Sequence, residues 1–177
     1  WQGELHIRTL GHRALYQWVS ISEMEAFRRK DRSYVCIASD ISELKHNEVR
    51  LNELAHYDSL TGLPNRLQLG KDLRTAISRA NRSRDSFAVL FIDIDNFKLI
   101  NDSFGHEVGD EVLKFFTGKL QSLMRESDTL ARNSGDEFVA LLEGDIEAVD
   151  AQQFAMRVLR TLESPFLYTD QKINISA

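Results

Sequence analysis

The feature that most constrains this chain is an apolar run that ends abruptly in carboxylates. Residues 87–92 read FAVLFI, a continuous apolar stretch with the length and composition of a strand buried on both faces of a sheet. Asp93 follows directly, and Asp95 comes two residues later. A buried strand of this kind would deliver acidic side chains to one edge of a sheet.

A second acidic group stands further along the chain, in a sequence typical of a β-hairpin. Two predicted strands, 129–133 and 137–142, are joined by a tight turn in which Gly135 can adopt a positive φ. Asp136 and Glu137 lie at the tip of this hairpin. If the hairpin pairs beside the first strand, the two acidic groups meet.

Such a cluster of carboxylates is a hard oxygen site that suits Mg²⁺ or Mn²⁺. Mg²⁺ typically takes only one or two protein carboxylates and completes its shell with water and phosphate oxygens. A DxD pair alone is more often a pair of solvated carboxylates at the end of an element. Here two acidic tips occur, and a strand, helix, strand and hairpin pattern lies between them, which favours a metal site. A phosphate-bearing substrate is the natural partner of such a site.

Between the two acidic groups the sequence predicts two helices with a break between them. Residues 96–104 predict a short helix, and residues 109–124 predict a longer one with an apolar face. The first amides of the short helix and Lys98 would lie where phosphate oxygens bind. Asn101 and Asp110 flank the break. Such residues are commonly helix caps, but an amide and a carboxylate can also match the edge of guanine.

Three segments occur in the order and spacing of a known family. They are DSLTGLPNR at 58–66, FIDIDNFKLINDSFGHEVGDEVL at 91–113 and SGDEF at 134–138. Together they resemble the GGDEF domain of diguanylate cyclases, from about residue 57 to the end of the chain. The resemblance implies an α+β fold with helices packed on a cyclase-palm (ferredoxin-like) sheet. It also implies an enzyme, a nucleotidyltransferase that condenses two GTP molecules into cyclic di-GMP and pyrophosphate.

The resemblance also implies roles for individual residues. Asp136 and Glu137 would be catalytic, with Glu137 as a further metal ligand or as a base. The residues expected to hold Mg²⁺ or Mn²⁺ are Asp93, Ile94 through its carbonyl, Asp136 and Glu137. The residues expected to bind substrate are Asn96, Phe97, Lys98, Asn101, Asp110, Ser134 and Gly135. The family uses an Asn and an Asp at the positions of Asn101 and Asp110 for guanine, which favours that role over capping.

Two further pairs of polar residues match the family. Arg125 and Asp128 form an RxxD pair separated by five residues from Ser134, the spacing of the family's inhibitory site for its product, cyclic di-GMP. From the residues alone, the alternative is a salt bridge at a helix end. Asp58 and Arg66 belong to the DSLTGLPNR turn and are expected to support the site structurally, with direct substrate contact as the less favoured role.

The N-terminal residues predict a different kind of unit. Three strands, at 4–10, 13–22 and 33–39, predict an antiparallel meander, and roughly 40 residues bury too little surface for a stable core. The pattern WQGELHIRTL…YQWVSIS…YVCIASDIS resembles the last three strands of a PAS sensor domain. The expected organisation is a PAS-like end at 1–40, a signalling linker helix at 41–56 and a GGDEF domain, truncated at its C-terminus, at 57–177.

The helix expected at 41–56 opens with Asp40 as its capping residue. Leu44 and Leu51 are seven residues apart, a coiled-coil signal too short to decide between pairing with another helix and packing on its own domain. The family joins its sensor to the cyclase through a dimeric signalling helix. The resemblance therefore favours a homodimer.

Composition limits the remaining classes. A hydrophobic content of 42% with 28% charged residues is ordinary for a soluble globular protein, and the net charge of −5 argues against a nucleic-acid polymer as partner. No apolar run reaches about 18 residues. We therefore expect a cytoplasmic protein whose residues make no direct membrane contact, with a membrane segment upstream of this chain left open. A single cysteine excludes an internal disulfide and a cysteine-rich zinc site.

Two departures from the family pattern leave an alternative function open. Ser134 stands where the family signature has its first glycine, which adds a side chain where the backbone approaches phosphate. The family domain also continues beyond the position of Ala177 with a strand and a helix whose basic residues contact phosphates. The alternative is a catalytically degenerate module that binds GTP or cyclic di-GMP and regulates a neighbouring phosphodiesterase domain. A purely structural dimerisation unit would leave the acidic cluster without a role.

Overall fold

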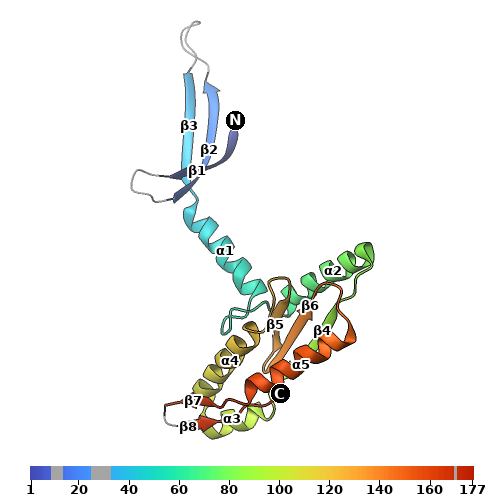
Figure 1. Cartoon of the computed structure of the whole chain (residues 1–177). Coiled ribbons are helices and arrows are strands. Elements are labelled where there is room, and N and C mark those ends of the chain that lie inside the picture. The colour runs from blue at the N-terminus through green and yellow to red at the C-terminus, as the bar shows by residue number, and fades with distance from the viewer. Residues whose placement is uncertain (9–13, 25–32, 170) are drawn as a thin grey trace. The chain divides into compact units, whose positions relative to one another are not determined.

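A computed structural model describes residues 1–8, 14–24, 33–169 and 171–177 of the chain (Figure 1). The chain forms two compact units, Trp1–Glu53 and Leu54–Ala177. The boundary between them falls inside helix α1 (Ser42–His56). Among the described residues, no helix is both long enough and apolar enough to cross a bilayer.

The first unit contains a three-stranded antiparallel sheet in the order β1 (Gln2–Arg8), β2 (Ala14–Met24), β3 (Ser33–Asp40). The described strand ends lie within two residues of the predicted ones, and the connections between the strands lie outside the described residues. Val19 is the one buried apolar side chain of this sheet among the described residues, whereas Ile37 is 61% exposed. By itself the sheet has almost no core.

Helix α1 follows the first sheet and starts one residue after the predicted position. Asp40 Oδ1 accepts a hydrogen bond from the Ser42 amide at 2.8 Å, so Asp40 satisfies the first amide of the helix. All of α1 is described, and none of its residues is buried. Leu44 and Leu51 are 64% and 67% exposed, which leaves both leucines available to a packing partner.

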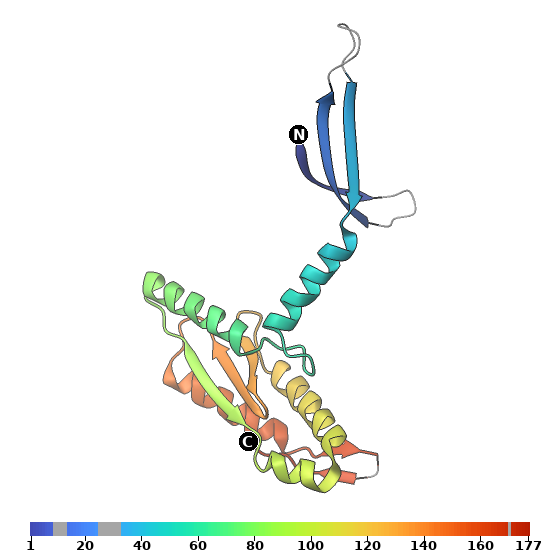
Figure 2. The same ribbon diagram turned by 180° about the vertical axis from the view of Figure 1, so that it is seen from behind.

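The second unit has the mixed helix and strand composition of the predicted α+β fold. Its elements are α2 (Arg66–Ser83), β4 (Ala88–Asp93), α3 (Phe97–Phe104), α4 (His106–Gln121), β5 (Thr129–Ser134), β6 (Glu137–Leu142), α5 (Ala148–Leu162), β7 (Phe166–Tyr168) and β8 (Gln171–Ile173). The main sheet has the order β4–β6–β5 with antiparallel neighbours, and β7 pairs with β8 in a separate hairpin. Helices α4 and α5 cover one face of the main sheet, and α2 runs along the other (Figures 1 and 2).

The central strand of the main sheet is β6, and it is buried on both faces. On the face of α4, the ring of Phe138 lies 5.0 Å from the ring of Phe116. On the opposite face, Val139 and Leu141 are equally inaccessible, at 1% and 0% exposed. A strand buried on both sides is held rigidly, so the turn at its beginning has a fixed base.

Strand β4 does not have the predicted burial on both faces. It lies at one edge of the described sheet order, where β6 is its neighbour. Ile92 faces the core and is 9% exposed, whereas the adjacent Phe91 is 77% exposed. The prediction was wrong because an apolar run records composition and not the place of a strand in its sheet.

The break between α3 and α4 also differs from the prediction. Gly105 adopts a φ of 87°, and α4 begins directly after it at His106, three residues before the predicted start at 109. One glycine with positive φ is enough to end α3 and let the next helix start at once. Gly109 therefore lies inside α4, where its lack of a side chain serves a different purpose.

Candidate functional site

The acidic end of β4 and the tip of the β5–β6 hairpin lie side by side. Asp93 pairs in register with Glu137, and Gly135 and Asp136 connect the two hairpin strands. Gly135 has a φ of 46°, in the region that favours glycine. The hairpin thus pairs beside β4, which is the condition under which the two acidic groups were expected to meet.

The carboxylates at this end of the sheet repel one another. Burial raises the pKa of Asp93, and the nearby negative charges of Asp136, Glu137 and Asp95 raise it further. The charged form of Asp93 is therefore disfavoured. A bound cation would remove that penalty, because it offsets the charge of every carboxylate around it.

The donor chemistry of this end fits Mg²⁺ or Mn²⁺. Among the described residues, no three carboxylate, imidazole or thiol side chains are already arranged to hold a metal ion. Mg²⁺ needs only one or two protein carboxylates, so Asp93 with one hairpin carboxylate meets its requirement. The Ile94 carbonyl accepts a long hydrogen bond of 3.4 Å from the Phe97 amide, which leaves its second lone pair for a ligand.

Glu137 is held by side chains of its own hairpin. Its Oε2 accepts hydrogen bonds from Ser134 Oγ at 2.8 Å and from Asn133 Nδ2 at 2.9 Å. These hydrogen bonds and the positive charge of Arg66 hold the pKa of Glu137 below its usual range. Glu137 is therefore ionised at neutral pH. Ser134, predicted to bind substrate, contacts Glu137 in this structure.

The first turn of α3 contains three of the predicted substrate residues. Asn96 has a φ of 54° and turns the chain from β4 into the helix. Its side chain makes no capping hydrogen bond to the first amides of α3. Two of the first amides of α3 already have acceptors, since Phe97 donates weakly to the Ile94 carbonyl at 3.4 Å and Leu99 donates to the Asn96 carbonyl at 2.8 Å. Lys98 is exposed beside them, and Phe97 is partly buried against the core.

Asn101 on α3 lies against Gly109 on α4. A carbon added at Gly109 would come within 1.9 Å of Asn101 Oδ1 and within 3.3 Å of the Phe97 ring, so at least the amide would have to move. The missing side chain at Gly109 thus provides the space that the Asn101 amide occupies. Asp110, the next residue, is exposed. Sequence reasoning missed this role of Gly109 because it treated the glycine as a helix start.

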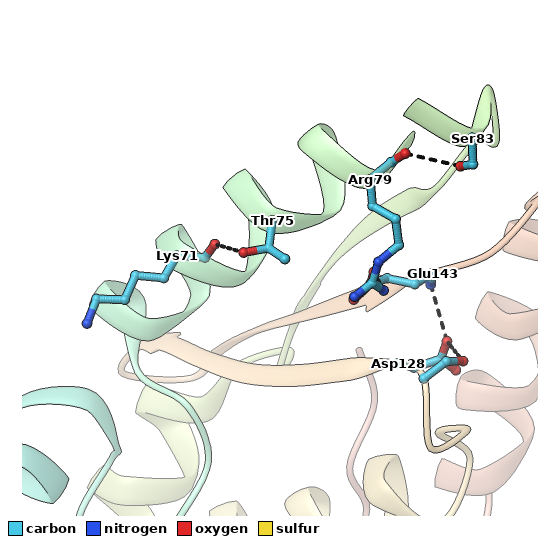
Figure 3. Close-up of polar contacts among 7 residues, drawn as sticks. Lys71, Thr75, Arg79, Ser83, Asp128 and Glu143 are labelled. Atoms are coloured by element: carbon cyan, nitrogen blue, oxygen red, sulfur yellow. Dashed lines mark hydrogen bonds and ion pairs between the residues drawn. The ribbon is translucent and has the colours of Figure 1, made fainter. Parts of the chain in front are cut away.

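Arg125 and Asp128 lie between α4 and β5 and line both a small cavity of about 40 Å³ and a surface pocket of about 610 Å³. Asp128 accepts a hydrogen bond from the backbone amide of Arg125 at 2.9 Å. It also accepts one from the backbone amide of Glu143 at 3.3 Å (Figure 3). No ion pair between Arg125 and a carboxylate occurs in the described part of the chain. The salt-bridge alternative is therefore not present. Arg157 of α5 lines the small cavity as well, a guanidinium that the sequence analysis did not single out.

A further pocket of about 370 Å³ separates the start of α2 from the end of β5. Arg66 lines its α2 side, and Arg132 and Ser134 line its β5 side. Arg66 was expected as a support, and its charge reaches Glu137. Arg132 was not singled out by the sequence analysis. The only feature of the sequence that could have indicated a role for Arg132 is that a basic residue stands inside a predicted hairpin strand.

Comparison with known proteins gives consistent matches for the second unit. A family model described as "Diguanylate cyclase, GGDEF domain" matches residues 55–177. The bifunctional diguanylate cyclase/cyclic di-GMP phosphodiesterase MucR of Pseudomonas aeruginosa is 41% identical over 127 residues, which are 72% of this chain and 18% of MucR. A diguanylate cyclase of Vibrio cholerae is 39% identical over 142 residues, which are 80% of this chain and 44% of that protein.

Solved structures agree with these matches. The GGDEF domain of TpbB from Pseudomonas aeruginosa is similar with a TM-score of 0.66 at 41% identity, covering 68% of this chain and 71% of that chain. The GGEEF domain of a diguanylate cyclase from Vibrio cholerae, described as active, has a TM-score of 0.57 at 39% identity and covers 63% of this chain and 71% of that chain. The present chain spans less than half the length of either curated relative.

Proposed function

Because this chain belongs to the GGDEF domain family of diguanylate cyclases, we propose that it condenses two GTP molecules into cyclic di-GMP and pyrophosphate. The observation that best supports this activity is the in-register pair of Asp93 and Glu137, which joins two acidic groups far apart in sequence. In each of two steps, a ribose 3′-hydroxyl attacks the α-phosphate of the other nucleotide. The new P–O bond forms as the bond to the pyrophosphate leaving group breaks.

We assign Asp93 and Asp136 to Mg²⁺ or Mn²⁺, with the Ile94 carbonyl and Glu137 as further ligands. When bound, the ion offsets charge on the phosphate oxygens and lowers the pKa of the attacking hydroxyl. The lowered pKa of Glu137 favours its role as a charged ligand over its role as a base, because a weaker base takes up a proton less readily.

The remaining site residues would bind the nucleotide. The residues assigned to the triphosphate are Asn96, Phe97, Lys98, Ser134 and Gly135, which form the start of α3 and the hairpin turn. Asp110 can accept the N1 and N2 hydrogens of guanine, and the Asn101 amide can pair with the rest of that edge. The space at Gly109 supports this assignment because it admits the Asn101 side chain against α4, at the residue that precedes Asp110.

The test is incubation of the chain with GTP and Mg²⁺, followed by separation of the nucleotides. Formation of a cyclic dinucleotide together with pyrophosphate supports the cyclase. Omission of the divalent ion should abolish the product, since the carboxylates alone would repel the triphosphate. GTP that remains unconverted under these conditions contradicts catalytic activity of this chain.

One observation favours a second candidate function, a module that binds GTP or cyclic di-GMP without turnover. Ser134 occupies the position of the first glycine in the family signature and holds Glu137 through its hydroxyl. Such a module could regulate a neighbouring phosphodiesterase domain, and MucR is named as a protein that combines both activities. Saturable GTP binding without product, together with product formation by Ser134→Gly, would select this candidate.

The space at Gly109 leads to a prediction about substrate binding. We expect Gly109→Ala to raise KM for GTP by about tenfold or more, because the added methyl group displaces the Asn101 amide. Gly118→Ala is the matched control, since it is exposed on the same helix and its added carbon meets nothing within 4 Å. This control should keep KM and gain up to about 1 kcal/mol of stability. A folded Gly109→Ala variant with unchanged KM would refute the guanine assignment.

We further propose that Arg125 and Asp128 bind cyclic di-GMP as an inhibitory product site. The Arg125 guanidinium can grip guanine or phosphate through two parallel hydrogen bonds. Arg125→Ala should therefore remove cyclic di-GMP binding in titration calorimetry. Arg160→Ala removes an exposed guanidinium of α5 that does not line this cavity and should bind as the parent does. Identical isotherms for Arg125→Ala and the parent would rule out the site.

The proposal also assigns a role to each part of the chain. Residues 1–40 would be the end of a PAS-like sensor domain, residues 41–56 the signalling linker and residues 57–177 the GGDEF domain. The first sheet and α1 both expose apolar side chains, which supports the proposal that each packs against a partner. GTP as substrate favours a cytoplasmic location, and a product made from two nucleotides favours a homodimer.

A further inference from the structure

Arg132 contacts two separate parts of the second unit, the 134–136 turn and the loop at 58–65. Its Nε donates to the carbonyl of Gly135 at 2.8 Å, and its Nη1 donates to Asp58 Oδ1 at 2.9 Å. Its backbone amide donates to the Pro64 carbonyl at 2.9 Å. The Arg132 side chain is only 12% exposed. One guanidinium therefore joins the 134–136 turn to Asp58, which lies 74 positions before Arg132.

Asp58 belongs to a compact loop that begins where α1 ends. The Asp58 amide donates to the Leu63 carbonyl at 2.8 Å, and Asp58 Oδ1 accepts from both the amide and the hydroxyl of Thr61, at 2.8 and 2.7 Å. Asn65 closes the loop on α1, because its side chain donates to the Ala55 carbonyl and its amide to the His56 carbonyl. The last turn of α1, this loop and Arg132 thus form one connected set of hydrogen bonds.

The electrostatics of Asp58 agree with this geometry. Burial acts to raise its pKa, but the hydrogen bonds from Thr61 and Arg132 outweigh burial and hold the pKa below its usual range. Asp58 is therefore charged when it binds Arg132. A charge-assisted hydrogen bond away from bulk water is stronger and more directional than one at the surface.

Arg132 restrains the 134–136 turn through the backbone of Gly135. Gly135 has no side chain to anchor its peptide groups, and a carbon added there would meet nothing within 4 Å. The Gly135 carbonyl belongs to the same peptide group as the Asp136 amide. Fixing that carbonyl fixes the orientation in which Asp136 leaves the turn.

We propose that Arg132 is a positioning residue that fixes the position of the Asp136 carboxylate. Because Arg132 is hydrogen-bonded to Asp58, this position also depends on the conformation of the last turn of α1. This inference rests on the proposed function, and it adds a route by which a change in the linker helix reaches the reacting phosphates. A purely structural ion pair would stabilise the unit without acting on the metal or on the chemical step. The two roles predict different measurements.

The experiment is a double-mutant cycle on the 177-residue chain with Arg132→Ala and Asp58→Asn. The first readout is the ¹⁵N resonance of the Asp136 amide, and the second is Mn²⁺ binding followed by electron paramagnetic resonance. Both single variants should shift the Asp136 amide and weaken Mn²⁺ binding. With GTP, kcat should fall about 10- to 100-fold while KM changes less than about threefold, because misplacement acts on the chemical step. The double variant should lose no more than Arg132→Ala alone, since both changes break one connection.

The matched control is Glu143→Gln, which weakens an ion pair of the same kind at the opposite end of the sheet. Arg79 of α2 reaches Glu143 just beyond β6, with Nη1 2.5 Å from Oε2 (Figure 3). This variant should change neither the Asp136 resonance nor Mn²⁺ binding. If Arg132→Ala does not fold, Arg132→Lys replaces it, because one ammonium cannot reproduce the fork that reaches both acceptors.

The outcomes separate this inference from the proposed function. An unmoved Asp136 resonance, unchanged Mn²⁺ binding or strictly additive effects in the cycle would overturn the positioning role. If the parent chain forms no product, the proposed cyclase fails, and the resonance and Mn²⁺ measurements still decide the role of Arg132. Equal shifts in Glu143→Gln would also overturn it, since they would show a general response to lost stability.

Discussion

Asp93→Asn should lower the rate of cyclic di-GMP formation about 100-fold or more while the protein stays folded. The substitution removes one charged ligand from the metal site and leaves the volume and shape of the side chain almost unchanged. Asp93 ends an edge strand and makes no part of the core. Its pKa is raised by burial and by neighbouring negative charges, so the loss of its charge relieves repulsion. The free energy of unfolding should therefore stay the same or increase.

The measurement combines product formation, Mn²⁺ binding and thermal unfolding. Asp85→Asn is a suitable control, because it neutralises an exposed carboxylate beyond the opposite end of β4. That variant should keep both activity and metal affinity. Undiminished turnover in Asp93→Asn would show that the metal is held elsewhere, and loss of folding would show that Asp93 has a structural role.

Replacing Leu44 and Leu51 with Lys should produce a monomer whose specific activity rises steeply with protein concentration. One domain offers one acidic end and one guanine pocket, whereas the product requires two GTP molecules that face each other. Pairing of α1 helices through the two exposed leucines would raise the effective concentration of one site near the other to the millimolar range. At micromolar protein we expect a loss of activity of about tenfold or more.

His46→Lys combined with Glu53→Gln is the matched control for this variant. These residues are also exposed and seven apart on α1, they lie on the opposite side of the helix, and the charge changes by the same amount. Sedimentation should show a dimer for this control and a monomer for the leucine variant. A leucine variant that remains dimeric, or a monomer that turns over at the full rate at high dilution, would contradict the paired-site geometry.

Much of the site was predictable because its signals are local. A strand followed by Asp93, a hairpin turn with Gly135 and a helix start at Asn96 depend on the conformational preferences of neighbouring residues. The pairing of the hairpin beside β4 was stated as the condition for a joint site, and the structure shows that pairing as antiparallel. Residues 58–66, 91–113 and 134–138 then carried the family resemblance, which the match over residues 55–177 confirms.

Other features depended on contacts between distant residues. The sequence did not show that β6 takes the centre of the sheet while Phe91 on β4 stays exposed, because apolar strands look alike until their neighbours are known. Nor did it show the space at Gly109 or the bridge from Arg132 to Asp58. Glycine, arginine and aspartate are common at surfaces, and burial together with the distance to a partner gives them their roles. The sequence thus specified which chemical groups the site contains, and tertiary packing decided which of them hold the others in place.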